Sequence, residues 1–433
     1  MSSIVALLTG HLSTRYYFVG LSTFFLLFAG TFYSSFYRLS RDRGDFNQLI
    51  EDGRLATETR QLGKTLPLEY PPTARPLFML LAAPPPTWSL VFWWFINAWF
   101  YWQSAVWLSR EIVTDGQGWK TLLPAFALIG LTSVGIVSDL SVGQLTGLIL
   151  FCVVGSFELD RRGYSLAGGA LLAISLLVKP LPAVLLLYYL LRRRWRFLCA
   201  TIATFILIGP LLLTVLFGWN AQVEGWRWFA ETTARQRSPL HVFHRWGDMP
   251  GMCLTFRESG LASSLIRLCM EVTYDKHRHN VQLLTLQPGI LRILWFLLVG
   301  LPLAWAACSV TRRKLETHHR FHAFAAMTGI MMLSNPKFIS YWLAVPLVTI
   351  APLAVCVWRT RRKGGADWIC FTALLIWLFS NISLGFPMLR AAGSIPFGLY
   401  AITLANLIRS QGDNEDDAET PSSDAEGIKH GGK

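Results

Sequence analysis

Long apolar segments recur along almost the whole chain, from Tyr16 to Ile408. One water-soluble core does not require so many uninterrupted apolar runs, and runs of this length suit helices that cross a lipid bilayer. Hydrophobic residues make up 53% of the chain and charged residues only 15%, which fits the same interpretation. The sequence therefore predicts an all-α polytopic protein of an inner or plasma membrane.

The distribution of charge predicts how the chain is oriented in that membrane. A net charge of +13 would suggest a nucleic-acid partner in a soluble protein. Here the basic residues gather in short clusters between apolar runs, as the positive-inside rule expects. These clusters lie at 192–194 with 196, at 312–314, and at 359 with 361–363. We expect them to be cytoplasmic, and we expect no nucleic-acid partner.

Counting outward from these clusters predicts about twelve membrane segments. They begin near residues 16, 87, 120, 144, 165, 180, 197, 289, 321, 338, 366 and 394. The first segment is too long for a signal peptide and carries no cleavage pattern, so it is predicted to be a retained anchor with a cytoplasmic N-terminus. A transmembrane domain over 1–408 is predicted to precede a disordered, acidic cytoplasmic tail over 409–433.

The stretch 165–191 must leave the cytoplasm and return as two membrane segments, because basic residues flank it on both sides. Pro180 is the natural break, since proline removes a backbone donor and clashes with the preceding turn. The short half-helices on either side suggest that they line a cavity. Lys179 should then face a phosphate, a carboxylate or water, because an ammonium in lipid is costly. A lysine that snorkels to the outer interface is an equally good explanation.

The same topology leaves two large loops, 38–75 and 218–287, on the outer face, where we expect the chemistry to take place. In the first loop, Phe46, Leu49, Ile50 and Ala56 recur near helical spacing between charged residues. This pattern is typical of a helix that lies in the membrane interface. A lipid-linked substrate would meet this helix.

Asp45 stands at the start of that predicted helix, directly after the first apolar segment. Its local sequence favours a structural role, because Asp45 can be an N-cap and Gln48 can complete a capping box. An ionised carboxylate just outside the lipid is also placed where it can have a functional role on the outer face. Both roles are compatible only if a carboxylate oxygen remains available to a substrate.

Metal and nucleotide motifs are not apparent in the sequence. It contains no CxxC, no HExxH and no clustered His/Cys spacing, so we predict no metal site. No glycine-rich loop follows a strand pattern, so we predict no nucleotide-binding domain and no cofactor. Of the seven cysteines, only Cys253 and Cys269 are placed to form a disulfide.

Several short motifs follow one another in a consistent order. They are Asp45-Phe46 after the first apolar segment, Tyr70-Pro71-Pro72, Gly143-Gln144, Lys179-Pro180 before an arginine-rich turn, Ser259 with Arg267, and Leu333-Ser334-Asn335-Pro336 before Tyr341. In their order and spacing, the chain resembles glycosyltransferase family 87 over roughly residues 16–400. The resemblance implies the C-type fold of glycosyltransferases that use polyprenyl-phosphate sugars, a group that includes mannosyltransferases.

The resemblance also implies an activity. Such an enzyme moves a hexose, most often mannose, from a polyprenyl phosphate donor to a hydroxyl of a glycolipid or glycan acceptor. Asp45 matches the catalytic acidic position and would act as the general base. Because phosphate leaves without protonation, one carboxylate suffices, and the anomeric carbon is inverted in a single displacement.

The resemblance further assigns binding roles. Lys179, Arg267 and Lys337 would bind the donor phosphate, and the residues expected to bind substrate are Tyr70, Gln144, Ser259 and Tyr341. Arg267 has the alternative of a solvated arginine on an amphipathic helix, and Lys337 that of an interfacial anchor. The chain departs from the family at Arg257-Glu258, where many relatives have Asn-Gln, and at Tyr341, near which many have histidine.

A polytopic lipid or solute transporter, or a flippase, is the main alternative, because broken membrane helices are common in transporters. Transporters usually show internal repeats and ionisable residues at mid-membrane depth. The sequence shows no convincing repeat, and its acidic residues gather in the outer loops. A third alternative, a scaffold, leaves the polar loop motifs unexplained. An enzyme is expected to place Asp45, Lys179 and Arg267 around one outward-opening cavity.

Overall fold

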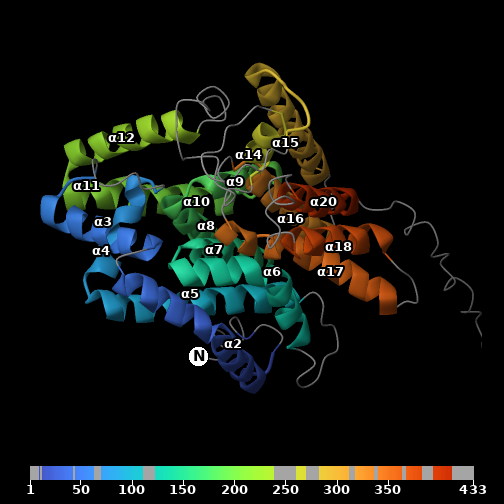
Figure 1. Ribbon diagram of the computed structural model, residues 1–433, viewed down its shortest axis with the longest axis horizontal. Helices are drawn as coiled ribbons and strands as arrows, with labels where there is room; N and C mark the ends of the chain where they lie inside the picture. The colour runs from blue at the N-terminus through green and yellow to red at the C-terminus, as the bar shows by residue number, and fades with distance from the viewer. Residues whose placement is uncertain are drawn as a thin grey trace, which may run out of the picture.

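The computed structural model describes residues 9, 12–41, 44–62, 70–110, 122–237, 260–269, 282–311, 317–335, 340–362, 367–382 and 394–411 (Figure 1), with only the backbone described at 232–237, 317–318, 340–341 and 361–362. Every secondary-structure element in these ranges is a helix, so the predicted all-α class is confirmed. In Figure 1, α2 lies at one edge of the molecule, and α12 and α15 lie at the opposite edge.

The helices in the first half of the chain have the following bounds. They are α2 Thr14–Ser40, α3 Asp45–Thr59, η1 Pro72–Ala74, α4 Arg75–Ala82, α5 Pro86–Ser109, α6 Leu123–Val142, α7 Thr146–Arg161, α8 Ser165–Val178, η3 Leu181–Ala183, α9 Val184–Leu191, α10 Trp195–Ile206, the π-helical turn η4 Leu207–Leu211 and α11 Leu212–Phe217. The second half contains α12 Trp219–Arg237, α14 Leu261–Cys269, α15 Pro288–Thr311, α16 Thr317–Leu333, η5 Ser340–Ala344, α17 Leu347–Arg362, α18 Trp368–Ile382 and α20 Ser394–Ser410.

Each predicted membrane segment begins within a few residues of one of these helices. Five described helices are long and apolar enough to cross a membrane alone, namely Thr14–Ser40, Leu123–Val142, Trp195–Phe217, Pro288–Thr311 and Trp342–Thr360. The pair Pro72–Ala82 and Pro86–Ser109 passes the same criterion together but bends by 116°. The apolar helices fit a polytopic membrane protein, and the number twelve stays a prediction.

The predicted break at Lys179-Pro180 is present. Helix α8 ends at Val178, and Lys179 adopts an extended backbone with φ −146° and ψ 134°. Pro180 then precedes the short helix η3, from which α9 continues. Because proline cannot continue the α8 hydrogen-bond pattern and restricts the residue before it, the chain turns at Lys179 in an extended conformation.

Helix α3 also forms where its apolar spacing predicts. Phe46, Leu49, Ile50 and Ala56 are all buried. Their face packs on protein, since α3 lies against α4 and the buried Asp52 of α3 forms an ion pair with the buried Arg75 of α4. The apolar pattern that suggested contact with lipid therefore serves packing on α4, and an interfacial position of α3 stays a prediction.

The predicted capping box at Asp45 is wrong. The N-cap of α3 is Gly44, whose φ of 106° suits glycine, and no side chain caps this helix end. Asp45 is consequently the first helical residue. Its carboxylate accepts a hydrogen bond from Gln144 on a distant turn.

Several predictions fall outside the described residues. Ser259, Lys337 and Cys253 are among these, and the side chain of Tyr341 is not described although its backbone belongs to η5. Helix α20 runs through Ser410, and residues 412–433, most of the predicted tail, also lie outside the described ranges. The disordered tail and the Cys253–Cys269 pair stay predictions.

Candidate functional site

The turn between α6 and α7 brings Gln144 to the start of α3. Gly143 ends α6 in a left-handed conformation, with φ 73° and ψ 37°, and its N–H donates to the carbonyl of Asp139 at 2.9 Å. A β-carbon at residue 143 would lie 2.7 Å from Cβ of Phe46. Glycine is therefore required both for the backbone conformation and for the close approach of α3.

Gln144 connects two other predicted site residues. Its Nε2 donates to Oδ2 of Asp45, and its Oε1 accepts from the hydroxyl of Tyr70. Gln144 and Tyr70 are both buried, whereas Asp45 is half-buried. A carboxylate only accepts, and the phenol donates here, so the two contacts fix which way the amide points.

Buried polar groups behind Gln144 hold the turn in place. The backbone carbonyl of Gln144 accepts from Nδ2 of Asn97 at 3.1 Å and from Nε1 of Trp93 at 3.3 Å. Asp139, which is fully buried, accepts from the same Asn97 Nδ2 at 2.8 Å and from the N–H of Thr146 at 3.3 Å. The hydrogen bonds to the Gln144 backbone carbonyl and to the Asp139 carboxylate therefore all hold the α6–α7 turn.

Asp139 and Asn97 belong to none of the motifs recognised in the sequence. The available signal was an aspartate inside the apolar run of α6, four residues before Gly143. An ionisable residue in such a run is rare and usually has a buried partner.

Lys179 lies on the other side of Tyr70. Its Nζ is 4.7 Å from the centre of the Tyr70 ring and 4.9 Å from the centre of the Trp342 ring, which are cation–π distances. Only 5% of Lys179 is exposed, so the alternative of a snorkelling lysine is wrong. Tyr70 therefore contacts Gln144 through its hydroxyl and Lys179 through its ring.

Asp45, Gln144, Tyr70 and Lys179 form one continuous chain of contacts, which we call the Asp45–Lys179 group. Its members come from the start of α3, the α6–α7 turn, the segment before η1 and the break after α8. These segments are remote in sequence, and the packing of the helices brings them together.

Arg267 is buried in α14, with 3% of its surface exposed. Its NH2 donates to Oγ of Ser264 at 3.2 Å, one turn earlier in the same helix. A solvated arginine on an amphipathic helix is therefore the wrong description. The Ser264 contact lies within α14 and does not by itself bring Arg267 to Asp45.

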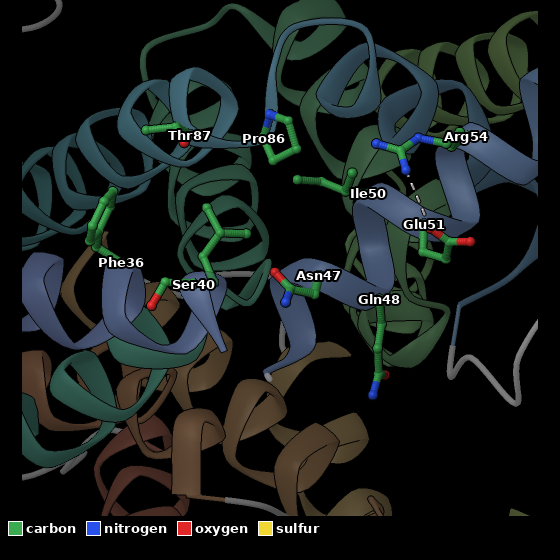
Figure 2. Close-up of a pocket in the computed structure, with 10 residues that line it drawn as sticks. Phe36, Ser40, Asn47, Gln48, Ile50, Glu51, Arg54, Pro86 and Thr87 are labelled. Carbon is green, nitrogen blue, oxygen red and sulfur yellow. Dashed lines mark ion pairs between the residues drawn. The ribbon is translucent and has the colours of Figure 1, made fainter. Parts of the chain in front are cut away.

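A cavity of about 520 Å³ opens beside α3. Figure 2 shows it between the end of α2, α3 and the start of α5, and it is lined by Phe36, Leu39, Ser40, Asn47, Gln48, Ile50, Glu51, Arg54, Pro86 and Thr87. Arg54 and Glu51 form a half-exposed ion pair at 3.8 Å on its wall. Asp45, Lys179 and Arg267 are not among the lining residues. The single cavity expected around these three stays a prediction.

Together, the apolar helices and a polar group gathered from their connections define a membrane protein with an internal polar site. The family model described as glycosyltransferase family 87 matches residues 68–336, well over half of the chain. The chain therefore belongs to glycosyltransferase family 87 and is a membrane glycosyltransferase. No curated protein and no solved structure matches it.

The matched range contains most of the predicted site residues. It contains Tyr70, Gln144 and Lys179, together with the two predicted residues Ser259 and Arg267. Asp45 precedes the range, and both Lys337 and Tyr341 follow it. The hydrogen bond from Gln144 is what connects Asp45 to the part of the chain that the family model covers.

Proposed function

We propose that this glycosyltransferase moves a hexose, with mannose as the first candidate, from a polyprenyl phosphate donor to a hydroxyl of a glycolipid or glycan on the outer face. Asp45 acts as the general base in an inverting single displacement. The observation that carries the proposal is the contact between Asp45 and Gln144, because it joins the acidic residue to the family-matched segments.

The surroundings of Asp45 suit a general base. Gln144 Nε2 donates to Oδ2 and orients the carboxylate, while a neutral amide leaves its negative charge uncompensated. As the first residue of α3, Asp45 also lies at the positive end of the helix dipole. The half-buried position leaves the carboxylate accessible to an acceptor hydroxyl.

The proposed step is a displacement at the anomeric carbon of the donor sugar. The acceptor oxygen forms a bond to the anomeric carbon from the side opposite the phosphate, and its proton passes to the Asp45 carboxylate. The bond between the anomeric carbon and the phosphate oxygen breaks, and its electron pair leaves with the polyprenyl phosphate. One inversion follows, with no covalent sugar–enzyme intermediate.

Lys179 is the proposed partner of the leaving phosphate. The cation lies over the rings of Tyr70 and Trp342 in a buried position, where an ammonium attracts an anion more strongly than it does in water. Arg267 and Lys337 are proposed as further phosphate ligands, and Tyr70, Gln144, Ser259 and Tyr341 as substrate-binding residues. We place this site on the outer face and both termini in the cytoplasm, following the basic clusters.

Membership in a glycosyltransferase family decides against the transporter and flippase alternative. The scaffold alternative is excluded on the same ground.

The proposal is tested by incubating the purified full chain with radiolabelled polyprenyl phosphate mannose and a membrane lipid extract. We expect a labelled product with the anomeric configuration opposite to that of the donor. Transfer from a nucleotide sugar but not from the lipid donor would overturn the donor class. Retention of configuration would overturn the single displacement.

A further inference from the structure

A second polar cluster lies among α16, α17, α18 and α20, and it is independent of the proposed reaction. Cys356, Asp367 and Cys370 each place one ligand atom within 4.8 Å of the others, and all three are buried. The Nε2 atom of the buried His322 lies 3.3 Å from Sγ of Cys356. We propose that these four side chains bind a divalent transition metal of the zinc class.

The hydrogen bonds around His322 fix its tautomer. The Nδ2 atom of Asn406 donates to the carbonyls of Thr349 at 2.8 Å and of Ile402 at 2.7 Å, so the Asn406 Oδ1 atom must be the one that faces Nδ1 of His322. Oδ1 is an acceptor only, and the 2.8 Å contact therefore requires a proton on Nδ1. In the neutral ring, the lone pair of Nε2 then points to Cys356. A histidine that binds a metal through one nitrogen typically donates its other N–H in this way.

The set of donor atoms fits zinc. Two thiolates and an imidazole are typical zinc ligands, and a carboxylate completes four-coordination. Bond lengths of about 2.0–2.3 Å in a tetrahedron put neighbouring ligand atoms roughly 3.5 Å apart. Nε2 of His322 lies 3.3 Å from Sγ of Cys356, and the ligand atoms of Cys356, Asp367 and Cys370 lie within 4.8 Å of one another, a group to which His322 does not belong. To share one ion with these three residues, the His322 side chain must move closer to the group.

Asp367 is already oriented by two contacts. It is the N-terminal cap of α18, with Oδ1 accepting from the N–H of Cys370 at 3.1 Å. Its Oδ2 forms an ion pair with NH2 of Arg409 at 2.8 Å. Each carboxylate oxygen has a second lone pair, so these contacts leave room for a metal bond. With two thiolates and one carboxylate on a divalent ion, the site carries one negative charge, which Arg409 balances.

A disulfide between Cys356 and Cys370 is the competing description. Both residues are thiols in the structure. The positive-inside rule predicts that the basic segment at 359–363, which follows Cys356, is cytoplasmic, and thiols remain reduced there. Metal binding is the use of two adjacent thiols that this compartment favours.

The sequence predicts no metal site because these ligands follow no short motif. Cys356 and Cys370 come from α17 and α18, and His322 comes from α16. Contacts among these helices and α20 bring the four side chains together, and the four helices form one side of the molecule in Figure 1. A metal there would join the helices and stabilise the fold.

The test measures metal in the purified full-length protein by elemental mass spectrometry. We expect about one zinc ion per chain, and near-ultraviolet thiolate-to-cobalt absorption after the ion is replaced by Co²⁺. The double variant Cys356→Ser/Cys370→Ser should lose the metal. The matched control Cys199→Ser/Cys308→Ser, which changes two exposed thiols, should keep it.

Two further readouts keep the test decisive if the double variant does not fold. Removal of zinc from the wild-type protein with a chelator should lower its thermal midpoint, and added Zn²⁺ should restore it. A wild-type protein that contains no metal and takes up neither Zn²⁺ nor Co²⁺ overturns the proposal. So does a pair of thiols that alkylating reagents detect only after reduction, because that result shows a disulfide. Neither outcome bears on sugar transfer.

Discussion

Charged groups are handled differently in two regions of this molecule. At the junction of α7 and α8, Glu158 forms ion pairs with Arg110 at 3.0 Å, Arg161 at 2.7 Å and Arg162 at 2.6 Å. In the Asp45–Lys179 group, by contrast, the carboxylate accepts from an amide and the ammonium lies over aromatic rings. Direct ion pairs neutralise charge and fix loops, whereas in the Asp45–Lys179 group neutral side chains lie between the carboxylate and the ammonium.

Replacing the carboxylate of Asp45 should have the largest effect. Asp45→Asn keeps the size of the side chain but removes the base, so the initial rate of sugar transfer should fall roughly 10²–10⁴-fold at unchanged folded protein level. Glu58→Gln, an exposed change on the same helix, is the matched control and should retain wild-type activity. Activity of Asp45→Asn close to wild type would sink the base assignment.

Removing the charge of Lys179 should have the next largest effect. Lys179→Met preserves the apolar stem, and loss of a charged phosphate contact of about 1.5–3 kcal/mol should raise the KM for the lipid donor roughly 10–100-fold. Lys179→Arg, which keeps the cation, should recover part of that loss. An unchanged donor concentration dependence in Lys179→Met would remove Lys179 from phosphate binding.

Removing the charge of Glu158 should lower the stability of the protein and leave donor binding unchanged. Glu158→Gln leaves three guanidinium groups around a neutral amide and should lower the free energy of unfolding by about 1–3 kcal/mol. Thermal unfolding in detergent measures the shift, and donor KM should not change. If Glu158→Gln weakened donor binding as strongly as Lys179→Met, the contrast between the two regions would be lost.

Tyr70→Phe should have the smallest effect. The variant removes the hydroxyl that donates to Gln144 but keeps the ring beneath Lys179. Loss of one neutral hydrogen bond, about 0.5–1.5 kcal/mol, should reduce kcat roughly 2–10-fold. Tyr70→Leu also removes the ring and should additionally raise donor KM. Equal kinetics for the two variants would show that the ring does not contribute to holding Lys179.

The periodicity of apolar residues predicted the helices well because it is a local property. The break at Lys179-Pro180 and the buried face of α3 follow from proline chemistry and from helical spacing. The sequence does not show what this face of α3 contacts, because packing on α4 and contact with the membrane interface require the same apolar stripe. The capping prediction failed because Gly44 starts the helix without a side-chain cap.

Within the site, motif order indicated Asp45, Gln144, Tyr70 and Lys179 individually. Their contacts depend on how the segments pack, and so do the contributions of Asp139 and Trp342, which no motif contains. The His322 and Cys356 contact was equally inaccessible, because no rule of spacing connects α16 to α17. Residue type and helical period are therefore readable from one sequence, whereas pairings between remote segments are not.

The tight approach of Gly143 to Phe46 has a consequence for natural variation in this family. Any side chain at 143 collides with Cβ of Phe46, an atom that every residue except glycine carries, so a smaller side chain at 46 does not relieve the collision. The left-handed backbone of residue 143 also favours glycine, so two independent constraints keep glycine at this position. The turn that presents Gln144 should accordingly accept few single-step mutations, although Gly143 itself has no part in the chemistry.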